Sequence, residues 1–343
     1  MTVPDTLHRL QALVDLNGNR GKILILMHDN PDPDALASAL GLEFLFRKMA
    51  GRESTIAYAG IIGRAENRAM IKHLHIPLTR LSDIDWNEYQ DVAMVDTQPL
   101  TGNNSLPANH LPTIVIDHHP LRPATRKVGY HEIRTGYNVT ASIITEFVIA
   151  SALEIDTRLA TAFFYALKSE TEGLGREVGP VEARLRHYLY PKVDQKVLAK
   201  IENARVSREY YRVIHAALEH CQVFEDVVIA RVEQATNPDI VAEVADLLMR
   251  LEKTRWSFCF GTVNGDILIS ARTTDRHNDA GQLMRRAVGE LGAAGGHEMM
   301  AGAKICVKSA SMARKRMIIR QLIERLLNLT GAAGSRGEKL IEY

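Results

Sequence analysis

Residues 22–35, which read KILILMHDNPDPDA, decide the fold of the first half of the chain. The run from Lys22 to Met27 is short and apolar, which is typical of a strand buried on both faces of a parallel sheet. Two prolines and an asparagine then predict a fixed loop. From Asp34 to Met49 the leucines recur on one face, which predicts a helix. This order of strand, loop and helix indicates an α/β fold.

The same two patterns recur along the chain after this stretch. Short apolar runs predict further buried strands, and longer amphipathic stretches predict helices. The strands are expected over Ser54–Ala59, Asp91–Val95 and Thr113–Ile116, and the helices over Val139–Leu153 and Thr157–Lys168. Parallel strands need a crossover connection, which is usually a helix. We therefore expect residues 1–190 to form an α/β domain with a mainly parallel sheet flanked by helices.

The second half of the chain changes character after a charged helical segment, residues 191–222, which we interpret as a linker. The Asn264-Gly265 dipeptide between two apolar runs predicts a hairpin. The elements expected after the linker are strands over Val223–Val232, Trp256–Val263, Ile267–Ala271 and Lys304–Val307, helices over Pro238–Arg250 and Ala280–Leu291, a glycine-rich loop, and a last helix to about Leu327. These elements predict a smaller α/β domain with a mixed sheet over residues 223–330, followed by a flexible tail over residues 331–343.

The composition narrows the class of protein. The chain has 343 residues, 42 Lys and Arg against 41 Asp and Glu, and an apolar fraction of 46%. A net charge of +1 disfavours a protein that coats long nucleic acid through charge alone. The three cysteines are widely spaced, so they predict neither a disulfide framework nor a thiolate metal site. Because no apolar run reaches the roughly 20 residues that span a bilayer, and the N-terminus lacks a signal-peptide core, we expect a cytoplasmic protein without a membrane partner.

Acidic and histidine side chains follow three of the predicted strands. The clusters are His28, Asp32 and Asp34, then Asp96, then Asp117, His118 and His119. Taken singly, each has a simpler explanation: Asp34 could only cap its helix, and Asp96 could only start a turn. In an open parallel sheet, however, the loops at the carboxyl ends of the strands meet at one edge. Three such clusters in register therefore favour one shared site.

Aspartate and histidine without cysteine suit a hard or borderline divalent ion. A carboxylate shared between two ions would give a two-metal site about 3.5–4 Å across. Sites of this kind activate water and stabilise both the attacking and the leaving oxygen, and their usual reaction is the hydrolysis of phosphate esters. The clusters therefore predict two divalent ions, with Mn²⁺ first and Mg²⁺ or Co²⁺ as alternatives.

The order of these motifs resembles a known family. HDNPDPDA at residues 28–35, VDT at 95–97 and IDHHP at 116–120 are similar to the successive motifs of the DHH phosphoesterase superfamily. The second half resembles its DHHA1 companion domain through AGGHEMMAG at residues 294–302. The resemblance covers about residues 20–308. Length and domain layout look most like the bacterial oligoribonuclease (nanoRNase)/pAp phosphatase branch, whereas the related RecJ-like exonucleases are usually larger.

The resemblance implies a metal ligand set. His28 and Asp32 would hold one ion, Asp34 and His118 would hold the other, and Asp96 would bridge the two.

The resemblance also implies catalytic residues and one departure from the family pattern. Asp117 and His119 would lie at the phosphate or support the ligands, with His119 orienting or protonating the leaving oxygen. The family usually has a further aspartate after the next helix, and Glu170 stands at that position here. Glutamate can bind a metal ion, but its extra methylene moves the carboxylate.

The second domain is expected to contact the substrate. Backbone N–H groups at Gly295 and Gly296 could approach a phosphate closely, and His297 adds a donor. Arg272 ends a predicted strand, and its guanidinium offers a bidentate fork for phosphate. The simpler explanation of the glycine loop is a plain turn, and the simpler explanation of Arg272 is an ordinary surface position. The resemblance favours substrate binding, because the family uses this loop for the nucleotide or its terminal phosphate.

We therefore expect a two-metal phosphoesterase that hydrolyses short nucleotide substrates. The candidates are 5′-phosphorylated oligoribonucleotides, linear dinucleotides such as pGpG or pApA, and pAp. One alternative is a cyclic dinucleotide phosphodiesterase of the same chemistry. The other is a nucleotide-binding regulator whose catalysis weakened when the further carboxylate became Glu170. A homodimer is compatible with the family, and long nucleic acid is not expected as a partner.

Overall fold

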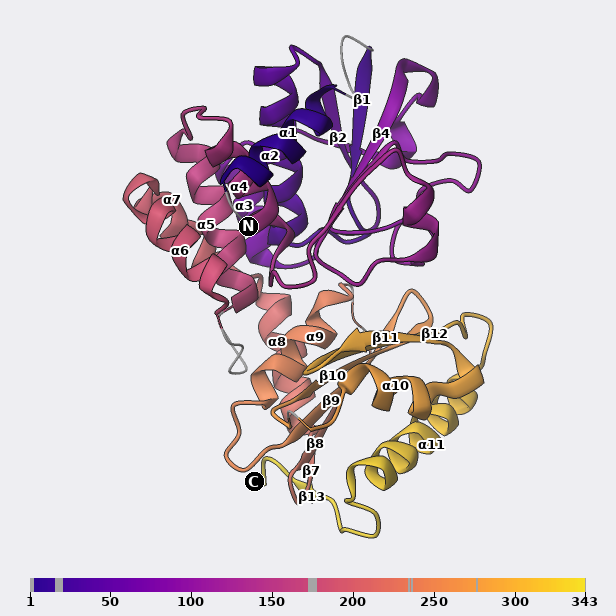
Figure 1. Ribbon diagram of the computed structural model, residues 1–343. Helices are drawn as coiled ribbons and strands as arrows, with labels where there is room; N and C mark the ends of the chain where they lie inside the picture. Colours follow the sequence, from indigo (N-terminus) through magenta and orange to yellow (C-terminus); the bar gives the residue numbers. More distant parts are fainter. Residues whose placement is uncertain are drawn as a thin grey trace. The chain divides into compact units, whose positions relative to one another are not determined.

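The computed structural model describes residues 3–15, 21–171, 178–233, 235, 237–275 and 277–342. The chain divides into two compact units, Met1–Ala204 and Arg205–Tyr343 (Figure 1). Each unit has its own sheet and its own core.

The first unit is built on a six-stranded sheet with the order β3-β2-β1-β4-β5-β6. Every pair of neighbouring strands is parallel. The strands are β1 (Lys22–Leu26), β2 (Ser54–Tyr58), β3 (Leu78–Arg80), β4 (Tyr89–Val95), β5 (Ile114–Asp117) and β6 (Tyr130–Ile133). This confirms the parallel sheet expected from the apolar runs, and β3 and β6 were not predicted.

The α-helices of the first unit pack into the main core on one face of this sheet. They are α1 (Val3–Asp15), α2 (Pro33–Met49), α3 (Ala65–His73), α4 (Thr140–Ala150), α5 (Thr157–Thr171), α6 (Pro180–Leu189) and α7 (Gln195–Glu202). Residues of α2, α4 and α5 share the main core with the alternate strand residues Ile23, Ile25 and Ile56. The helices approach closely at Gly41, where a Cβ atom would lie 2.5 Å from Phe163 Cζ. The other face of the sheet has a smaller core that the 3-10 turns η1 (Leu81–Asp83) and η2 (Trp86–Glu88) help to cover.

The second unit has a seven-stranded mixed sheet with the order β11-β12-β10-β9-β8-β7-β13. Only the β8–β9 pair is parallel within the described residues. The strands are β7 (Gln222–Phe224), β8 (Val227–Val232), β9 (Trp256–Val263), β10 (Asp266–Thr273), β11 (Ala293–His297), β12 (Met300–Ile305) and β13 (Glu338–Lys339). This confirms the mixed sheet expected for the C-terminal half.

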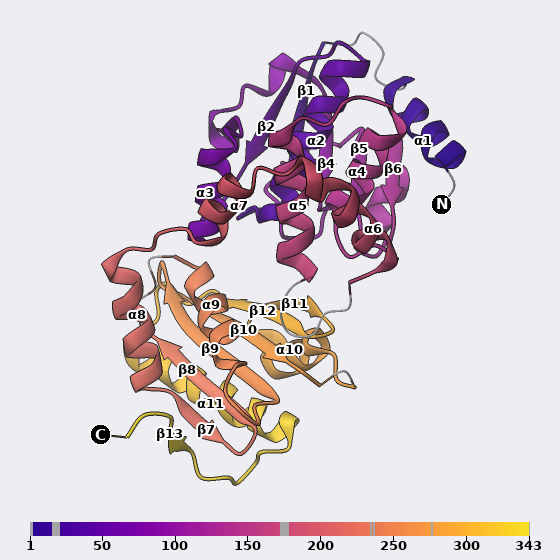
Figure 2. The ribbon, with the colours of Figure 1, turned by 90° about the vertical axis from the view of Figure 1, so that its left-hand side faces the viewer.

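Helices lie on both faces of the second sheet (Figures 1 and 2). They are α8 (Arg208–Glu219), α9 (Asp239–Leu248), α10 (Ala280–Val288) and α11 (Met312–Thr330). The side chains of β8 alternate between two cores: Val227 and Ile229 pack with α10 and α11, whereas Val228 and Ala230 pack with α8 and α9. The period of two along the strand thus assigns each helix pair to one face.

Two local predictions in the second unit are wrong. The single strand expected over Val223–Val232 is a hairpin of β7 and β8, because the chain reverses at Glu225, whose φ is +54°. The expected glycine-rich loop is instead the β11–β12 hairpin, which turns at Glu298 and Met299. Glycine has no side chain, so the stretch lacks the alternation that predicts a strand.

The segment expected as a linker, residues 191–222, contains two helices that pack on different units. α7 packs on α3 and α5, whereas α8 packs on β8 and α9. The boundary between the compact units follows Ala204, which lies between the two helices.

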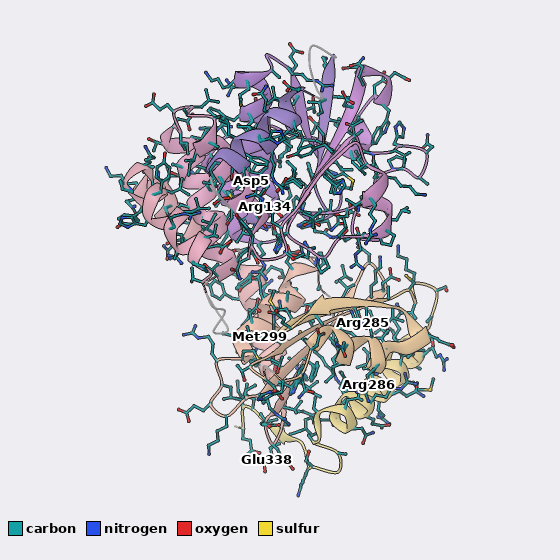
Figure 3. All side chains as sticks on the ribbon, in the orientation of Figure 1. Asp5, Arg134, Arg285, Arg286, Met299 and Glu338 are labelled. Carbon is teal, nitrogen blue, oxygen red and sulfur yellow. The ribbon has the colours of Figure 1, made fainter. Side chains whose placement is uncertain are left out.

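The C-terminal segment expected as a flexible tail differs from that expectation. Glu338, labelled in Figure 3, belongs to β13, which pairs with β7 at the edge of the sheet. Leu340 N donates to Cys221 O at 3.1 Å, and Ala332 is buried. Edge strands have unpaired backbone groups, so a polar segment can join them without an apolar pattern. None of the helices in the described ranges is long and apolar enough to cross a membrane.

Candidate metal centre

The predicted site residues of the first unit converge beyond the carboxyl ends of β1, β4 and β5. These three strands are neighbours in the sheet, so the loops that follow them meet. His28 lies two residues after β1, Asp96 follows β4 directly, and β5 ends at Asp117, immediately before His118 and His119.

Asp96 lies at the centre of the histidines. Its Oδ2 atom is 3.5 Å from His28 Nε2, and its Oδ1 atom is 3.6 Å from His118 Nε2 and 3.8 Å from His119 Nδ1. Asp96 is only 4% exposed. One carboxylate therefore faces imidazoles from both of the other strand loops.

The backbone at Asp96 is in an unusual conformation. Its φ is +57°, in the left-handed region that non-glycine residues rarely adopt. Two contacts fix it there: its N–H donates to Ile116 O at 3.0 Å, and Thr140 Oγ1 donates to its Oδ1 at 2.9 Å. Residues held in such conformations cluster at functional sites, where the surrounding structure stabilises them.

Asp32 faces the same centre and begins α2. Its Oδ1 accepts a hydrogen bond from Ala35 N at 3.0 Å, which makes it the N-cap of the helix. Its Oδ2 lies 3.5 Å from His28 Nε2. The helix cap is thus Asp32, and the interpretation of Asp34 as the cap of this helix is wrong.

Asp34 instead receives the N-terminus of a different helix. Its two carboxylate oxygens accept from Thr140 N at 2.8 Å and Ala141 N at 2.7 Å, in the first turn of α4. Ser38 Oγ donates to Oδ1 at 3.2 Å. The other oxygen lies 4.0 Å from His118 Nε2. Asp34 is 2% exposed, so these donors replace the water that its carboxylate would otherwise bind.

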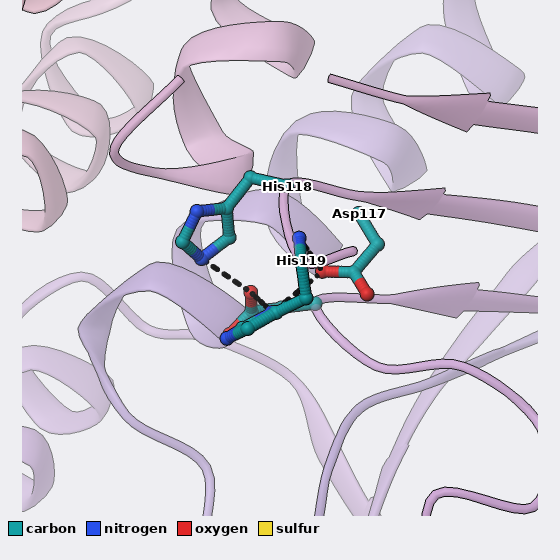
Figure 4. Close-up of side chains that lie close together, drawn as sticks. Asp117, His118 and His119 are labelled. Carbon is teal, nitrogen blue, oxygen red and sulfur yellow. Dashed lines mark hydrogen bonds and ion pairs between the residues drawn. The ribbon is translucent and has the colours of Figure 1, made fainter. Parts of the chain in front are cut away.

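The two histidines of the Asp117-His118-His119 triplet are oriented by different partners, and Figure 4 shows the three labelled side chains close together. His118 Nδ1 lies 3.1 Å from Tyr137 O, a contact in which Nδ1 donates its proton, and this turns Nε2 towards the carboxylates of Asp96 and Asp34. His119 Nδ1 lies 2.9 Å from Asp117 Oδ1. Each ring is therefore fixed from its Nδ1 side.

Gln98 supports the triplet and was missed from the sequence. Its Nε2 donates to Asp117 Oδ2 at 2.7 Å, and its Oε1 accepts from Arg122 N and Thr125 Oγ1, both at 2.8 Å. The side chain is 1% exposed. The only local signal is its position two residues after Asp96, since glutamine in a loop is ordinary. Thr140, which begins α4 and donates to Asp96, was also missed, because a threonine at the start of a helix is ordinary.

The charges of the site shift the pKa values of its side chains. Burial and the charge of Asp96 raise the pKa of Asp34 well above its usual value. Burial lowers the pKa of His28, but Asp32 and Asp96 overcome it and raise that pKa well above 6.5. In return, His28 holds the pKa of Asp32 at about 2, against the effect of burial. The cluster carries more negative charge than its histidines neutralise, which is the condition for binding cations.

The pKa of His119 is raised to about 9 by its hydrogen bond to Asp117 and by the charge of Asp96, although burial acts the other way. The pKa of Asp117 is lowered, because the contacts with His119 and Gln98 outweigh its burial.

The geometry of the cluster fits divalent ions. Two atoms that each lie about 2.0–2.2 Å from one ion are at most roughly 4.4 Å apart. The contacts of Asp96 with the three histidines, at 3.5–3.8 Å, meet this condition. Two groups have all their ligand atoms within 4.8 Å of one another, and Asp96 belongs to both: one comprises Asp96, Asp117, His118 and His119, and the other comprises His28, Asp32 and Asp96.

Asp34 and Glu170 lie outside these two groups. Asp34 approaches His118 at 4.0 Å, as given above. Glu170 is in the last turn of α5, and its charge is one of the causes that raise the pKa of Asp34. Glu170 is thus close enough for its negative charge to influence the titration of Asp34.

The substrate residues expected in the second unit lie on two neighbouring parts of its sheet. Gly295 and Gly296 are in the edge strand β11, where they pair with Gly302 and Ala301 of β12. At Gly296 φ is +134° and a Cβ would lie 2.3 Å from Met300 O, so a side chain does not fit there. The side chain of His297 lies outside the described part.

Arg272 is in β10 and is 6% exposed. Its Nε atom donates to Asp246 Oδ1 at 2.5 Å, and its Nη1 atom donates to Ala271 O at 3.0 Å. The explanation of Arg272 as an ordinary surface arginine is therefore wrong.

Comparison with known proteins follows the two units. The DHH family, N-terminal domain, matches residues 22–167, and the DHHA1 domain matches residues 225–328. An uncharacterized protein of Methanocaldococcus jannaschii is 36% identical over 311 residues, which cover 90% of this chain and 63% of that protein. The chain thus spans less than two thirds of that relative's length.

Solved structures show the same fold. An exopolyphosphatase-related protein from Bacteroides fragilis superposes with a TM-score of 0.72 at 15% identity, over 94% of this chain and 98% of that one. RecJ from Thermus thermophilus, in complex with Mg²⁺, superposes with a TM-score of 0.54 at 12% identity, over 94% of this chain and 52% of that one. The chain therefore carries a DHH family N-terminal domain followed by a DHHA1 domain.

Proposed function

We propose that the chain is a phosphoesterase that depends on two divalent ions and hydrolyses short nucleotide substrates. The substrates are 5′-phosphorylated oligoribonucleotides, linear dinucleotides and pAp. The observation that carries the proposal is that Asp96 belongs to both groups of candidate ligands at one sheet edge. The RecJ structure obtained with Mg²⁺ supports the use of a divalent ion by this fold.

The proposed ligands follow from the contacts of the cluster. His28 and Asp32 hold one ion, Asp34 and His118 hold the other, and Asp96 is shared. Bound ions supply activated water and stabilise negative charge on the phosphate oxygens. Glu170 is proposed to complete the set, because its charge reaches Asp34.

His119 is proposed as the residue that protonates the leaving oxygen. Its raised pKa, about 9, keeps a proton on the ring at neutral pH. Asp117 holds Nδ1, so Nε2 is the atom left to give the proton. Gln98 fixes Asp117 in turn, and the ring thereby keeps one orientation.

The second unit is proposed to bind the nucleotide. Gly295 and Gly296 expose backbone at an edge strand, where a phosphate could approach without meeting a side chain. His297 and Arg272 are proposed as donors, with Asp246 holding the guanidinium in place. The near-neutral charge of +1 favours short substrates over long polymers, which need an extended basic track.

The test is turnover by the full-length chain with Mn²⁺ on a panel of pAp, pGpG, pApA and 5′-phosphorylated oligoribonucleotides of two to five residues. We expect hydrolysis of at least one member and its loss in Asp96→Asn. The matched control is Asp83→Asn, because Asp83 is an exposed aspartate of the same unit. No turnover of any member by metal-loaded protein would refute the proposal.

Two comparison arms separate the alternatives. Cyclic di-AMP and cyclic di-GMP are tested at the same enzyme concentration, and preferred cleavage of either would replace the proposal with a cyclic dinucleotide phosphodiesterase. Glu170→Asp tests the regulator alternative: an inactive parent with an active variant would support it. Loss of metal and activity in Glu170→Ala, with an active parent, would make Glu170 a working ligand.

A further inference from the structure

Two positions that continue apolar rows of the second unit carry cations: Arg231 on β8, which is exposed, and Lys315 on α11, which is buried. On β8, Val227 and Ile229 face the core shared with α11, and Arg231 is next in the same alternation. On α11, Ile318 and Leu322 pack into that core, and Lys315 precedes Ile318 by one helical step on the same face.

These two cations line a cavity between β8, β9 and α11. The cavity measures about 160 Å³, and Arg316 and Arg320 of α11 also line it. Its apolar wall includes Phe260, which is opposite Arg231 in the β8–β9 pairing. Glu233 is the acidic side chain among the lining residues.

Lys315 is the strongest sign that this cavity is built for a ligand. It is 6% exposed, and within the described ranges its side chain has no hydrogen bond or ion pair. Arg231, Arg316 and Arg320 are exposed, and within those ranges their side chains have no hydrogen bond or ion pair either. The stem of Lys315 is therefore packed into the fold, while its ammonium group has no opposite charge beside it in the cavity.

The pKa of Arg231 also indicates a surplus of positive charge in the cavity. Burial and then the charge of Arg320 lower the pKa of Arg231, and Glu233 opposes this only as a smaller effect. One carboxylate cannot neutralise four cations, so the cavity favours an anion.

We propose that this cavity is a phosphate-binding site separate from the metal centre. Complete small-molecule sites measure roughly 300–1,000 Å³. A cavity of about 160 Å³ therefore takes one phosphate group rather than a whole nucleotide. Arginine and lysine are the side chains that bind phosphate, Arg through its fork and Lys as a point charge. The group comes from free phosphate or from the phosphate of a nucleotide that extends out of the cavity.

The test is isothermal titration of the full-length chain with inorganic phosphate and, separately, with a nucleoside 5′-monophosphate. Lys315→Met keeps the length of the side chain and removes its charge. We expect affinity for inorganic phosphate to fall about tenfold or more in Lys315→Met, the size expected for one charge-assisted contact. Arg314→Met is the matched control, since Arg314 is on the same helix and outside the cavity.

The variant Asp96→Asn distinguishes phosphate binding at the metal centre from phosphate binding in the cavity. We expect this variant to keep the phosphate affinity that Lys315→Met loses, whatever the outcome for hydrolysis. Equal affinity for both probes indicates that the site reads the phosphate alone, and tighter binding of the monophosphate indicates a nucleotide; both support the proposal. Arg320→Gln provides a second variant on the exposed side of the helix. Phosphate affinity unchanged in both Lys315→Met and Arg320→Gln, or lost only in Asp96→Asn, would overturn the proposal.

Discussion

The metal centre of the first unit and the cationic cavity of the second are both clusters of unbalanced charge, but they are built differently. The acidic cluster is surrounded by donors: Thr140 and Ala141 bind Asp34, and Gln98 binds Asp117. The cavity of the second unit has cations without such partners in the described ranges.

The two clusters differ because their residues lie in different parts of the fold. The acidic residues lie on loops beyond strand ends, where backbone N–H groups and polar side chains are available to hold them. Two of the cations, Arg231 and Lys315, stand where the alternation on a strand and a helix would place apolar residues, and Glu233 is the one acidic side chain among the residues that line the cavity. The first cluster is thus pre-organised without its ligand, whereas the second gains most from binding one.

The largest effect is expected where one residue serves both ion sites. Asp96→Asn removes the shared charge while keeping the shape of the side chain. Because residues that only support ligands change affinity or activity by about 10–100-fold, loss of a shared ligand should lower turnover by more than about 100-fold. The measurement is the hydrolysis rate with Mn²⁺ beside Asp83→Asn. If Asp96→Asn keeps the parental rate, the acidic cluster is not the catalytic centre.

A smaller effect is expected from the residue that holds Asp117 in place. Gln98→Leu removes the donor to Asp117 Oδ2 and leaves that oxygen unsatisfied, while Oδ1 keeps its contacts with His119. We expect turnover to fall by roughly 10–100-fold and the free energy of unfolding by roughly 1–3 kcal/mol. Steady-state kinetics and denaturant melts measure the two effects. A loss of stability with unchanged kinetics would limit Gln98 to a structural role.

The raised pKa of His28 predicts proton release on metal binding. The raised pKa keeps the ring protonated to a higher pH than an unperturbed imidazole, and an imidazole must be neutral to bind an ion. Raising the pH therefore helps binding: Mn²⁺ affinity should increase with pH from 6 to 8, up to about tenfold per unit for each proton released. Titration calorimetry in buffers of different ionisation enthalpy counts the protons. The same affinity across this range would contradict the electrostatic account of the site.

The smallest effect is expected on the stability of the cationic cavity. Lys315→Met removes one of four cations that line the same cavity and repel one another, so the melting temperature without phosphate should rise by a few degrees. The turnover rate should stay unchanged, because Lys315 is not part of the metal centre. Thermal melts with and without phosphate measure this, and the stabilisation by phosphate should be weaker in the variant. A lower melting temperature in the absence of phosphate would show that the charge already has a partner.

The sequence predicts the parallel sheet and the position of the acidic loops because both depend on local patterns. β1, β4 and β5 are apolar runs, and the aspartates and histidines follow them directly along the chain. Their convergence follows from strand order alone.

The partners of these residues could not be predicted, because they come from elsewhere in the fold. Asp34 binds the first turn of α4 more than a hundred residues away, so its role as a helix cap was assigned to the wrong helix. Gln98 has no local signal because its role depends on burial, and Arg231 has none because its role depends on α11 packing beside β8. The β11 strand was missed because consecutive glycines have no side-chain alternation.

The most direct test of the central claim is anomalous diffraction from crystals of the full-length chain grown with Mn²⁺. The account predicts two manganese peaks about 3.5–4 Å apart, with the carboxylate of Asp96 between them and His28 and His118 on opposite sides. No peak at this sheet edge, or a single ion that does not contact Asp96, would contradict it.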